Sequence, residues 1–150
     1  MSRAYPARPM VGLGIILLRG QDVLLARRAK PPGAGTWSLP GGAQELGETA
    51  EAGARRELLE EAGVTAGALR LIAHVDIIHH DAVGRVLYHY TILDFVGQWV
   101  GGTAKAGSDV SAVAWAAVDN LEPYALSEDA LRIIALAVSS AVAMGSRYAG

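Results

Sequence analysis

The sequence predicts an α/β fold in which a mixed β-sheet lies between helices. Segments rich in β-branched and aliphatic residues are separated by two segments with helix caps, in the order strands, helix, strands, helix. A sheet that is apolar on both faces is covered by a helix on each face, which gives an α/β/α sandwich. The chain has 150 residues, so we expect one domain, residues 1–150, with residues 1–8 as a loose lead-in.

The first predicted element is a β-hairpin. Val11–Leu18 is largely aliphatic, Gly20–Asp22 is a turn signal, and Val23–Ala26 is apolar again. Residues 29–35 are rich in proline and glycine, which predicts a loop. This loop leads into a short extended segment, Trp37–Leu39.

A helix is predicted between Thr49 and Gly63. Thr49 is the expected N-cap, and Glu51 lies in the first turn, where the helix dipole favours an acid. Gly63 is the expected glycine after the last turn. The apolar side carries Ala54, Leu58, Leu59 and Ala62. Gly53 costs a helix about 1 kcal/mol relative to alanine, so we expect a ligand or another backbone segment to approach it closely.

The second half of the chain alternates between strands and loops before a final helix. His74 and Asp76 fall on the polar side of an alternating pattern, which predicts a half-buried strand. Ser127 is the expected N-cap of the last helix. In order, the predicted elements are a strand at Leu69–Ile78, a loop at His79–Arg85, a strand at Val86–Val96, a loop at Gly97–Gly107, a strand at Ser111–Val118 and a helix after Ser127.

The composition excludes several classes of protein. The formal net charge is −2, so the chain has no electrostatic grip on polymeric nucleic acid. It contains no cysteine, which excludes disulfides, thiolate metal sites and a cysteine nucleophile. The apolar run Ile133–Met144 is shorter than the roughly 20 residues that span a bilayer. We therefore expect a soluble, cytoplasmic protein that does not bind membranes.

Three glutamates in the first helix indicate a metal site. Residues three and four apart share one face of a helix, so Glu57, Glu60 and Glu61 lie on a single arc. Carboxylates crowded in this way repel one another unless a cation lies among them, and hard divalent cations prefer oxygen ligands. A solvated acidic helix face is the alternative interpretation.

The stretch from Gly42 to Val64 resembles the Nudix box, the signature of the Nudix hydrolase family. Long motifs with fixed spacing are specific, and every defining position is matched. The preceding segment Trp37–Gly41 also resembles the usual approach to the box. The matched positions are Gly42, Glu48, Arg56, Glu57, Glu60, Glu61, Gly63 and Val64.

The resemblance implies a Nudix-type α/β/α sandwich and hydrolysis of a nucleoside diphosphate linked to another moiety. It implies that Glu57 and Glu61 are the main ligands of Mg²⁺ or Mn²⁺ and that the carbonyl of Gly41 is a further ligand. Glu60 would help to bind the metal or would orient and deprotonate the water.

The same resemblance implies that Glu48 pairs with Arg56 and fixes the loop against the helix. Metal ions that neutralise phosphate charge and lower the pKa of bound water suit this reaction. Catalysis of this kind depends mainly on positioning and electrostatics.

Two substrate classes and one non-enzymatic role stay open. The substrate is either ADP-ribose or a similar derivative, or a nucleoside triphosphate, including oxidised ones. Residues His79–Asp81 stand where ADP-ribose-type relatives tend to have a proline, which weakens the first alternative. A non-catalytic nucleotide-binding regulator is the rival class, although such modules often lose the acids that this chain keeps. A homodimer is expected only by analogy with relatives.

Several other residues are secondary candidates. Asp109 stands where relatives often place another acid, which makes it a candidate for a metal or base role. His79 and His80 are adjacent and lack ligand spacing, so a strand-end loop is the favoured interpretation. Arg27 is taken as an exposed arginine that could contact phosphate. The tryptophans are candidates for base stacking, with core packing favoured for the last: Trp37, Trp99 and Trp115.

Overall fold

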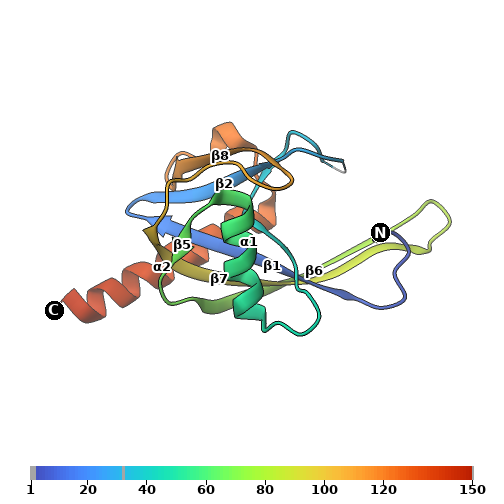
Figure 1. The fold of residues 1–150 in the computed structure, drawn as a ribbon, viewed down its shortest axis with the longest axis horizontal. Coiled ribbons are helices and arrows are strands. Elements are labelled where there is room, and N and C mark those ends of the chain that lie inside the picture. Colours follow the sequence, from blue (N-terminus) through green and yellow to red (C-terminus); the bar gives the residue numbers. More distant parts are fainter. Residues whose placement is uncertain (1–2, 32, 150) are drawn as a thin grey trace.

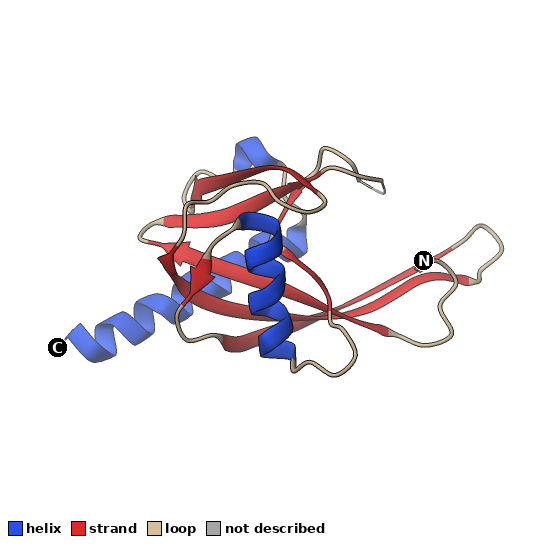
Figure 2. Ribbon diagram, in the orientation of Figure 1, coloured by secondary structure: helices blue, strands red, loops and turns tan. Residues whose placement is uncertain are grey.

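The protein is an α/β/α sandwich in which two helices cover opposite faces of a mixed sheet. The computed structural model describes residues 3–31 and 33–149, with side chains as far as residue 141. Helix α1 (Ala50–Ala62) lies in front of the sheet and α2 (Glu128–Ala149) lies behind it (Figure 1, Figure 2). This arrangement confirms the predicted fold class. In the part of the chain described, no helix is long and apolar enough to cross a membrane.

Strand β1 (Met10–Arg19) is the centre of the sheet. It runs parallel to β7 (Val86–Gly101) over its whole length and antiparallel to β2 (Asp22–Arg28) and β4 (Gly41–Ala43) at its two ends. The parallel pair makes the sheet mixed. The remaining elements are β3 (Trp37–Ser38) and β8 (Val110–Ala117) on β2, β5 (Thr65–Ala66) and β6 (Arg70–His80) on β7, and the 3₁₀ turn η1 (Glu122–Tyr124) before α2.

The alternation of side chains along β1 builds both layers of the core. Successive residues of a strand point to opposite faces. Leu13, Ile15 and Leu17 pack beneath α1, whereas Ile16 and Leu18 pack beneath α2. Each is at most 3% exposed, and burial of such a side chain stabilises the fold by about 1.5–3 kcal/mol. β1 therefore supports the helix that carries the acids and the helix behind the sheet.

The ends of two predicted strands, and the starts of the two loops predicted to follow them, are wrong. β7 continues through Gly97 to Gly101, where a glycine-rich loop was expected. Gly97 pairs with Leu17, and a Cβ at this glycine would lie 2.6 Å from Cδ2 of Leu69. Close side-chain packing therefore requires this glycine, and it marks no turn. His79 and His80 belong to β6 and pair with β7, so they are strand residues and not loop residues.

The β6–β7 hairpin projects beyond the body of the domain and is tied to the N-terminal lead-in (Figure 1). The hydroxyl of Tyr5 donates to Oδ2 of Asp81 at 2.9 Å, and its backbone N–H donates to the carbonyl of Leu87 at 2.9 Å. Arg85 donates to the same Asp81 oxygen and lies over the Tyr5 ring. The lead-in that was expected to be loose is thus held at Tyr5.

Candidate active site

Both ends of α1 are capped as the sequence predicts. Oγ1 of Thr49 accepts a hydrogen bond from the N–H of Ala52 at 3.1 Å, which satisfies one of the free donors of the first turn. Gly63 adopts a left-handed conformation with φ 68°, and its N–H donates to the carbonyl of Leu59. Ala54, Leu58 and Ala62 are buried on the core side of α1 as predicted, whereas Leu59 is 56% exposed. The acids therefore project from a helix whose register is fixed at both ends.

Arg56 is the centre of the acidic cluster. Its Nε and Nη2 donate in parallel to the two carboxylate oxygens of Glu48, at 3.0 and 2.7 Å. Its Nη1 donates to Glu57 at 2.9 Å and to Glu60 at 3.2 Å. Nη2 also donates to the carbonyl of Ala43 at the end of β4. One guanidinium thus joins the glycine loop to the acids of α1 and offsets their mutual repulsion.

The pairing makes Glu48 a strongly ionised group. Hydrogen bonds from Arg56, and then from the backbone N–H of Glu45, lower the pKa of Glu48 to about 2. The hydrogen bonds to Glu48 in turn raise the pKa of Arg56 above its ordinary value. The brace between loop and helix predicted by the family resemblance is therefore present as a bidentate ion pair.

Burial raises the pKa values of Glu61 and Glu57, whereas that of Glu48 is lowered. Burial raises the pKa of Glu61 to about 7, although the N–H of Gly41, which donates to its Oε1 at 2.8 Å, opposes the rise. The nearby charges of Glu57 and Asp109 raise it further. Burial likewise raises the pKa of Glu57, against the hydrogen bond from Arg56. These two carboxylates therefore lie where added positive charge is stabilising.

Glycines allow the loop, the helix and the acids to pack closely. A Cβ at Gly42 would lie 2.5 Å from Cδ of Glu57, and one at Gly41 would lie 1.9 Å from the carbonyl oxygen of Leu13. A Cβ at Gly53 would lie 2.6 Å from Oε1 of Glu48. The close approach expected at Gly53 is thus made by side chains of Glu48 and Leu13, and not by a ligand or a backbone segment.

A loop after β7 holds the last turn of α1, and sequence reasoning missed it. The N–H groups of Lys105, Gly107 and Ser108 donate to the last carbonyls of the helix, those of Ala62, Glu61 and Glu60, at 2.9 to 3.1 Å. A Cβ at Gly107 would lie 1.9 Å from the carbonyl oxygen of Glu60. Loop residues therefore satisfy the helix end that carries two of the acids. Gly107 is the sequence feature that could have indicated this close contact, but glycine occurs in loops for many other reasons.

Asp109 lies next to the acidic cluster at the end of this loop. Its carboxylate forms an ion pair with Lys30 at 3.0 Å, and its charge contributes to the raised pKa of Glu61. Its φ is 60°, which is uncommon for a residue other than glycine. The structure therefore brings Asp109 close to Glu61, whereas His79 and His80 lie at the end of β6 on the projecting hairpin.

The three tryptophans make contacts within the fold. Arg19 lies over the ring of Trp115 at 4.1 Å and near that of Trp99 at 5.6 Å. Trp37 packs edge-on against Tyr124, with centroids 5.2 Å apart, and lies 5.6 Å from the guanidinium of Arg27. Trp99 and Trp115 are thus occupied by Arg19, and Trp37 lies on the α2 side of the sheet.

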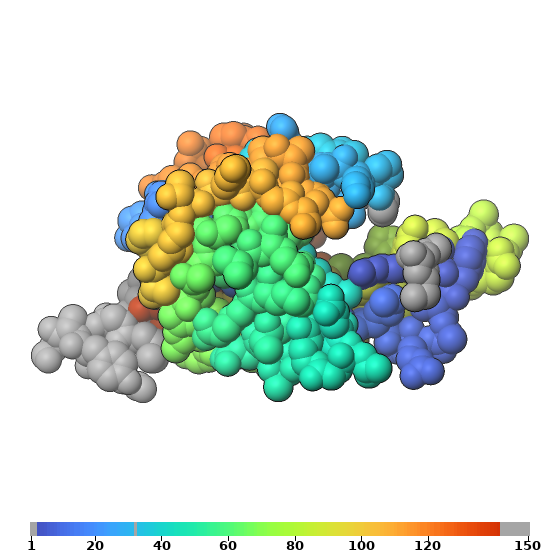
Figure 3. Space-filling model, in the orientation of Figure 1, coloured from blue at the N-terminus to red at the C-terminus, as the bar shows by residue number. Residues whose placement is uncertain are grey.

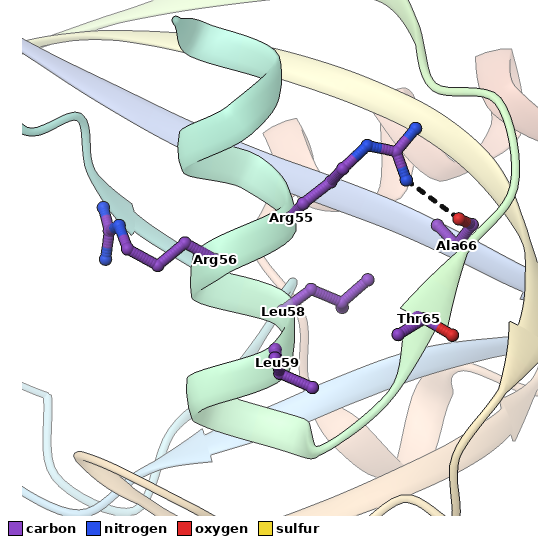
Figure 4. Close-up of a pocket in the computed structure, with 6 residues that line it drawn as sticks. All are labelled: Arg55, Arg56, Leu58, Leu59, Thr65 and Ala66. Atoms are coloured by element: carbon purple, nitrogen blue, oxygen red, sulfur yellow. Dashed lines mark hydrogen bonds between the residues drawn. The ribbon is translucent and has the colours of Figure 1, made fainter. Parts of the chain in front are cut away.

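A shallow pocket lies on the other side of α1 from the acids. It measures about 220 Å³ and is lined mainly by Arg55, Leu58, Leu59 and Ala66. Arg55 donates to the carbonyl of Ala66 at 2.8 Å, and Figure 4 shows that Arg55 and Arg56 leave the helix in opposite directions. The pocket is mainly apolar, and although Arg56 borders it, none of the acids Glu48, Glu57, Glu60 and Glu61 lines it.

The carboxylates of Glu57, Glu60 and Glu61 supply the oxygen donors that a hard divalent cation prefers. Among the described residues, no three His, Cys, Asp or Glu side chains are arranged to hold a metal ion. The guanidinium of Arg56 lies between Glu57 and Glu60 instead. The raised pKa values of Glu57 and Glu61 and their oxygen donors fit an added cation.

An acidic helix behind a glycine loop, packed on a mixed sheet, is the arrangement that the resemblance to the Nudix hydrolases implied. A family model described as NUDIX domain matches residues 8–137. The chain therefore belongs to the Nudix family and is a Nudix hydrolase.

Relatives with different named substrates resemble the chain. It is 31% identical over 121 residues to an ADP-ribose pyrophosphatase of Methanocaldococcus jannaschii, covering 81% of this chain and 69% of the relative. It is 43% identical over 61 residues to an oxidized purine nucleoside triphosphate hydrolase of Mus musculus, of whose length it spans 39%. A MutT NUDIX hydrolase of Burkholderia pseudomallei has a similar structure, with TM-score 0.70 and 31% identity over 85% of this chain and 95% of that one.

Replacing Arg56 by lysine tests the guanidinium brace. Lysine cannot form the parallel pair of hydrogen bonds to Glu48. We expect Arg56→Lys to lower the free energy of unfolding by about 2 kcal/mol and to reduce hydrolysis more than tenfold, because Glu57 and Glu60 lose their shared partner. Urea denaturation and a nucleotide hydrolysis assay measure the two effects. Arg55→Lys is the matched control: it loses bonds to two carbonyls on the far side of α1 and should keep its activity.

The ion pair of Glu48 predicts a pH dependence of stability. A pKa that is lower in the folded state stabilises the fold above the unfolded value, 4.5, and this stabilisation is lost as pH falls towards 2. Wild type should therefore exceed Glu48→Gln in stability at pH 7, and the difference should shrink between about pH 5 and pH 2. Urea midpoints across this range measure it. A difference that stays constant with pH would show that the ionised pair contributes nothing.

Proposed function

We propose that this Nudix hydrolase cleaves the pyrophosphate bond of a nucleoside diphosphate linked to another moiety, using Mg²⁺ or Mn²⁺. One observation carries the proposal: three glutamates share one face of α1, and Arg56 and the N–H of Gly41 hold them in place. Two of these acids are also partly buried with raised pKa values, a combination that is frequent among functional carboxylates.

Glu57 and Glu61 are the residues that would hold the cation, with Glu60 and the carbonyl of Gly41 as further ligands. Their oxygen donors match the preference of Mg²⁺ and Mn²⁺. Gly42 lets the Glu57 carboxylate pack directly against the loop, because a Cβ at Gly42 would collide with Glu57. When bound, the cation neutralises phosphate charge and lowers the pKa of attacking water.

The other residues of the cluster position the water and the acids. The side chain of Glu60 is 48% exposed, against 15% for that of Glu57, so Glu60 is the acid best placed to orient water or to take its proton. The water oxygen forms the new bond to phosphorus while the bond to the bridging oxygen breaks. Glu48 and Arg56 act through their neighbours, since Arg56 fixes Glu57 and Glu60.

The substrate is a small nucleotide or nucleoside diphosphate derivative. The named activities of the relatives support both alternatives, ADP-ribose and oxidised nucleoside triphosphates. Products separate the two: ADP-ribose yields AMP and a sugar phosphate, whereas a triphosphate yields a monophosphate and inorganic pyrophosphate. The complete set of box acids argues against the alternative role as a non-catalytic nucleotide-binding regulator. The cytoplasmic location and the homodimer stay predictions. Light scattering, which measures the molar mass in solution, tests the homodimer.

Neutralising one metal-binding acid at a time tests the mechanism. We expect Glu57→Gln and Glu61→Gln each to lower kcat/KM about a hundredfold or more, because each loses a charge that binds the cation. A panel of GTP, ATP and ADP-ribose, assayed with and without Mg²⁺, measures this. Full activity of both variants would contradict the mechanism.

The melting temperature of Glu61→Gln serves as a control for folding. Burial raises the pKa of Glu61, so its ionisation opposes folding when no cation is present; this cost grows as pH rises from 4.5 to about 7 and is fully present above that. Glu61→Gln should therefore melt at the same temperature as wild type or higher at pH 8 in EDTA. An inactive but stable variant separates loss of chemistry from loss of fold.

A further inference from the structure

Strand β6 is an edge of the sheet. Its ladder partner is β7, and β1 lies along the opposite side of β7. Within the part of the chain that the structure describes, β6 pairs with no other strand. The backbone N–H and C=O groups on its outer side therefore have no ladder partner, although such groups are obligatory hydrogen-bonding groups.

This edge is long and uncovered. No residue of β6 is fully buried, and Leu71 and Ile78 are 52% and 48% exposed. Figure 3 shows that the yellow-green hairpin containing the end of β6 stands out from the body of the domain. The strand contains neither lysine nor proline, the residues that most often protect an edge from pairing. An edge of this kind is a template for a further strand.

The available length of β6 is limited at both ends. The pairing with β7 is irregular between Leu71 and Ala73 and again between His79 and His80. Irregularities of this kind bend a strand and interrupt its ladder. The regular stretch Ala73–His79 is therefore the part of the edge on which another strand can pair.

His74 and Asp76 are the polar side chains in the middle of this stretch. Val75 packs against the core beneath α2, so His74 and Asp76 lie on the opposite face of the sheet. Nε2 of His74 is 3.8 Å from Oδ2 of Asp76, which is too far for a hydrogen bond. The two side chains are 66% and 56% exposed. Both groups can therefore take a partner from outside the chain.

We propose that two copies of this chain join β6 to β6 in antiparallel pairing about a two-fold axis at Val75, so that one sheet runs through both copies. His74 of each copy then lies opposite Asp76 of the other. On the α2 face, Ala73 lies opposite Ile77 and the two copies of Val75 meet. This inference does not rest on the proposed reaction, and it gives the expected homodimer a defined surface.

The register follows from symmetry and charge. Antiparallel pairing of two identical edges requires a two-fold axis perpendicular to the sheet, so residues equally distant from the axis face one another. An axis at Asp76 would bring two carboxylates together, and like charges directly opposite are destabilising. An axis at His74 would pair Asp76 with no histidine. Among the registers within Ala73–His79, only the axis at Val75 places Asp76 opposite a histidine, which favours a second copy over an unrelated strand.

A single cysteine tests the register, because the chain contains none of its own. Directly opposite Cβ atoms are about 5 Å apart, which a disulfide can bridge. We expect Val75→Cys, treated with oxidised glutathione, to form a covalent dimer on a non-reducing gel. Ile77→Cys is the matched control on the same face. Its two copies would be separated by about 13 Å along the strands, so it should stay monomeric on the gel.

An exchange of charges tests the pairing without a covalent bond. Sedimentation equilibrium should show wild type as a dimer. His74→Asp places a carboxylate opposite Asp76 at two symmetric points and should raise the dissociation constant of the dimer about tenfold or more. Combining it with Asp76→His exchanges the two side chains and restores both opposite pairs. The double variant should therefore dimerise nearly as well as wild type.

Both positions are exposed, so the variants should keep their fold, which circular dichroism checks. A wild type that stays monomeric would overturn the proposal and leave the edge to a strand of another protein. A dimer that both cysteines cross-link equally, or that His74→Asp does not weaken, would overturn it as well. Neither experiment measures hydrolysis, so failure of the proposed function would leave these outcomes unchanged.

Discussion

The guanidinium of Arg56 is the contact on which the site depends. It is the partner of Glu48, Glu57 and Glu60, and it also reaches the carbonyl of Ala43 in β4. Without a positive group at this point, the acids of α1 would face one another across a short distance in a partly buried setting, where charge repulsion is poorly screened. One side chain thus lets an acidic helix fold before any cation arrives. It also fixes the distance between that helix and the glycine loop.

The sheet imposes a second constraint, because β1 changes partners along its length. At Leu18 its antiparallel neighbour is β2, and at Gly12–Gly14 it is β4. The change brings the glycines of β4 under the acids of α1 and leaves β4 as an edge. Glycine is needed on both sides of this junction, since a Cβ at Gly41 would meet the carbonyl of Leu13 and one at Gly14 would meet Asp94. The same backbone junction therefore borders the α1 acids on one face and a buried carboxyl on the other.

The sequence predicted local features well and long-range features poorly. The caps at Thr49 and Gly63 and the shared face of the glutamates depend on residues a few positions apart, and the structure confirms them. Gly97 was misassigned because its side-chain partner, Leu69, is distant in sequence, and a glycine required by packing looks like one required by a turn. The N–H groups of residues 105–108 that hold the end of α1 left no pattern, since backbone donors are the same in every residue.

The division between what was and was not predicted also separates groups that are close in the sequence from groups that meet only in the fold. The acids that we propose as cation ligands lie on one continuous helix, so a fixed spacing encodes them. The surroundings of Asp94 come from β1, β6, β7 and α2, which meet only after folding. Its carboxyl is destabilising where it lies unless a donor reaches it, and a core selected for stability alone would place an apolar side chain there.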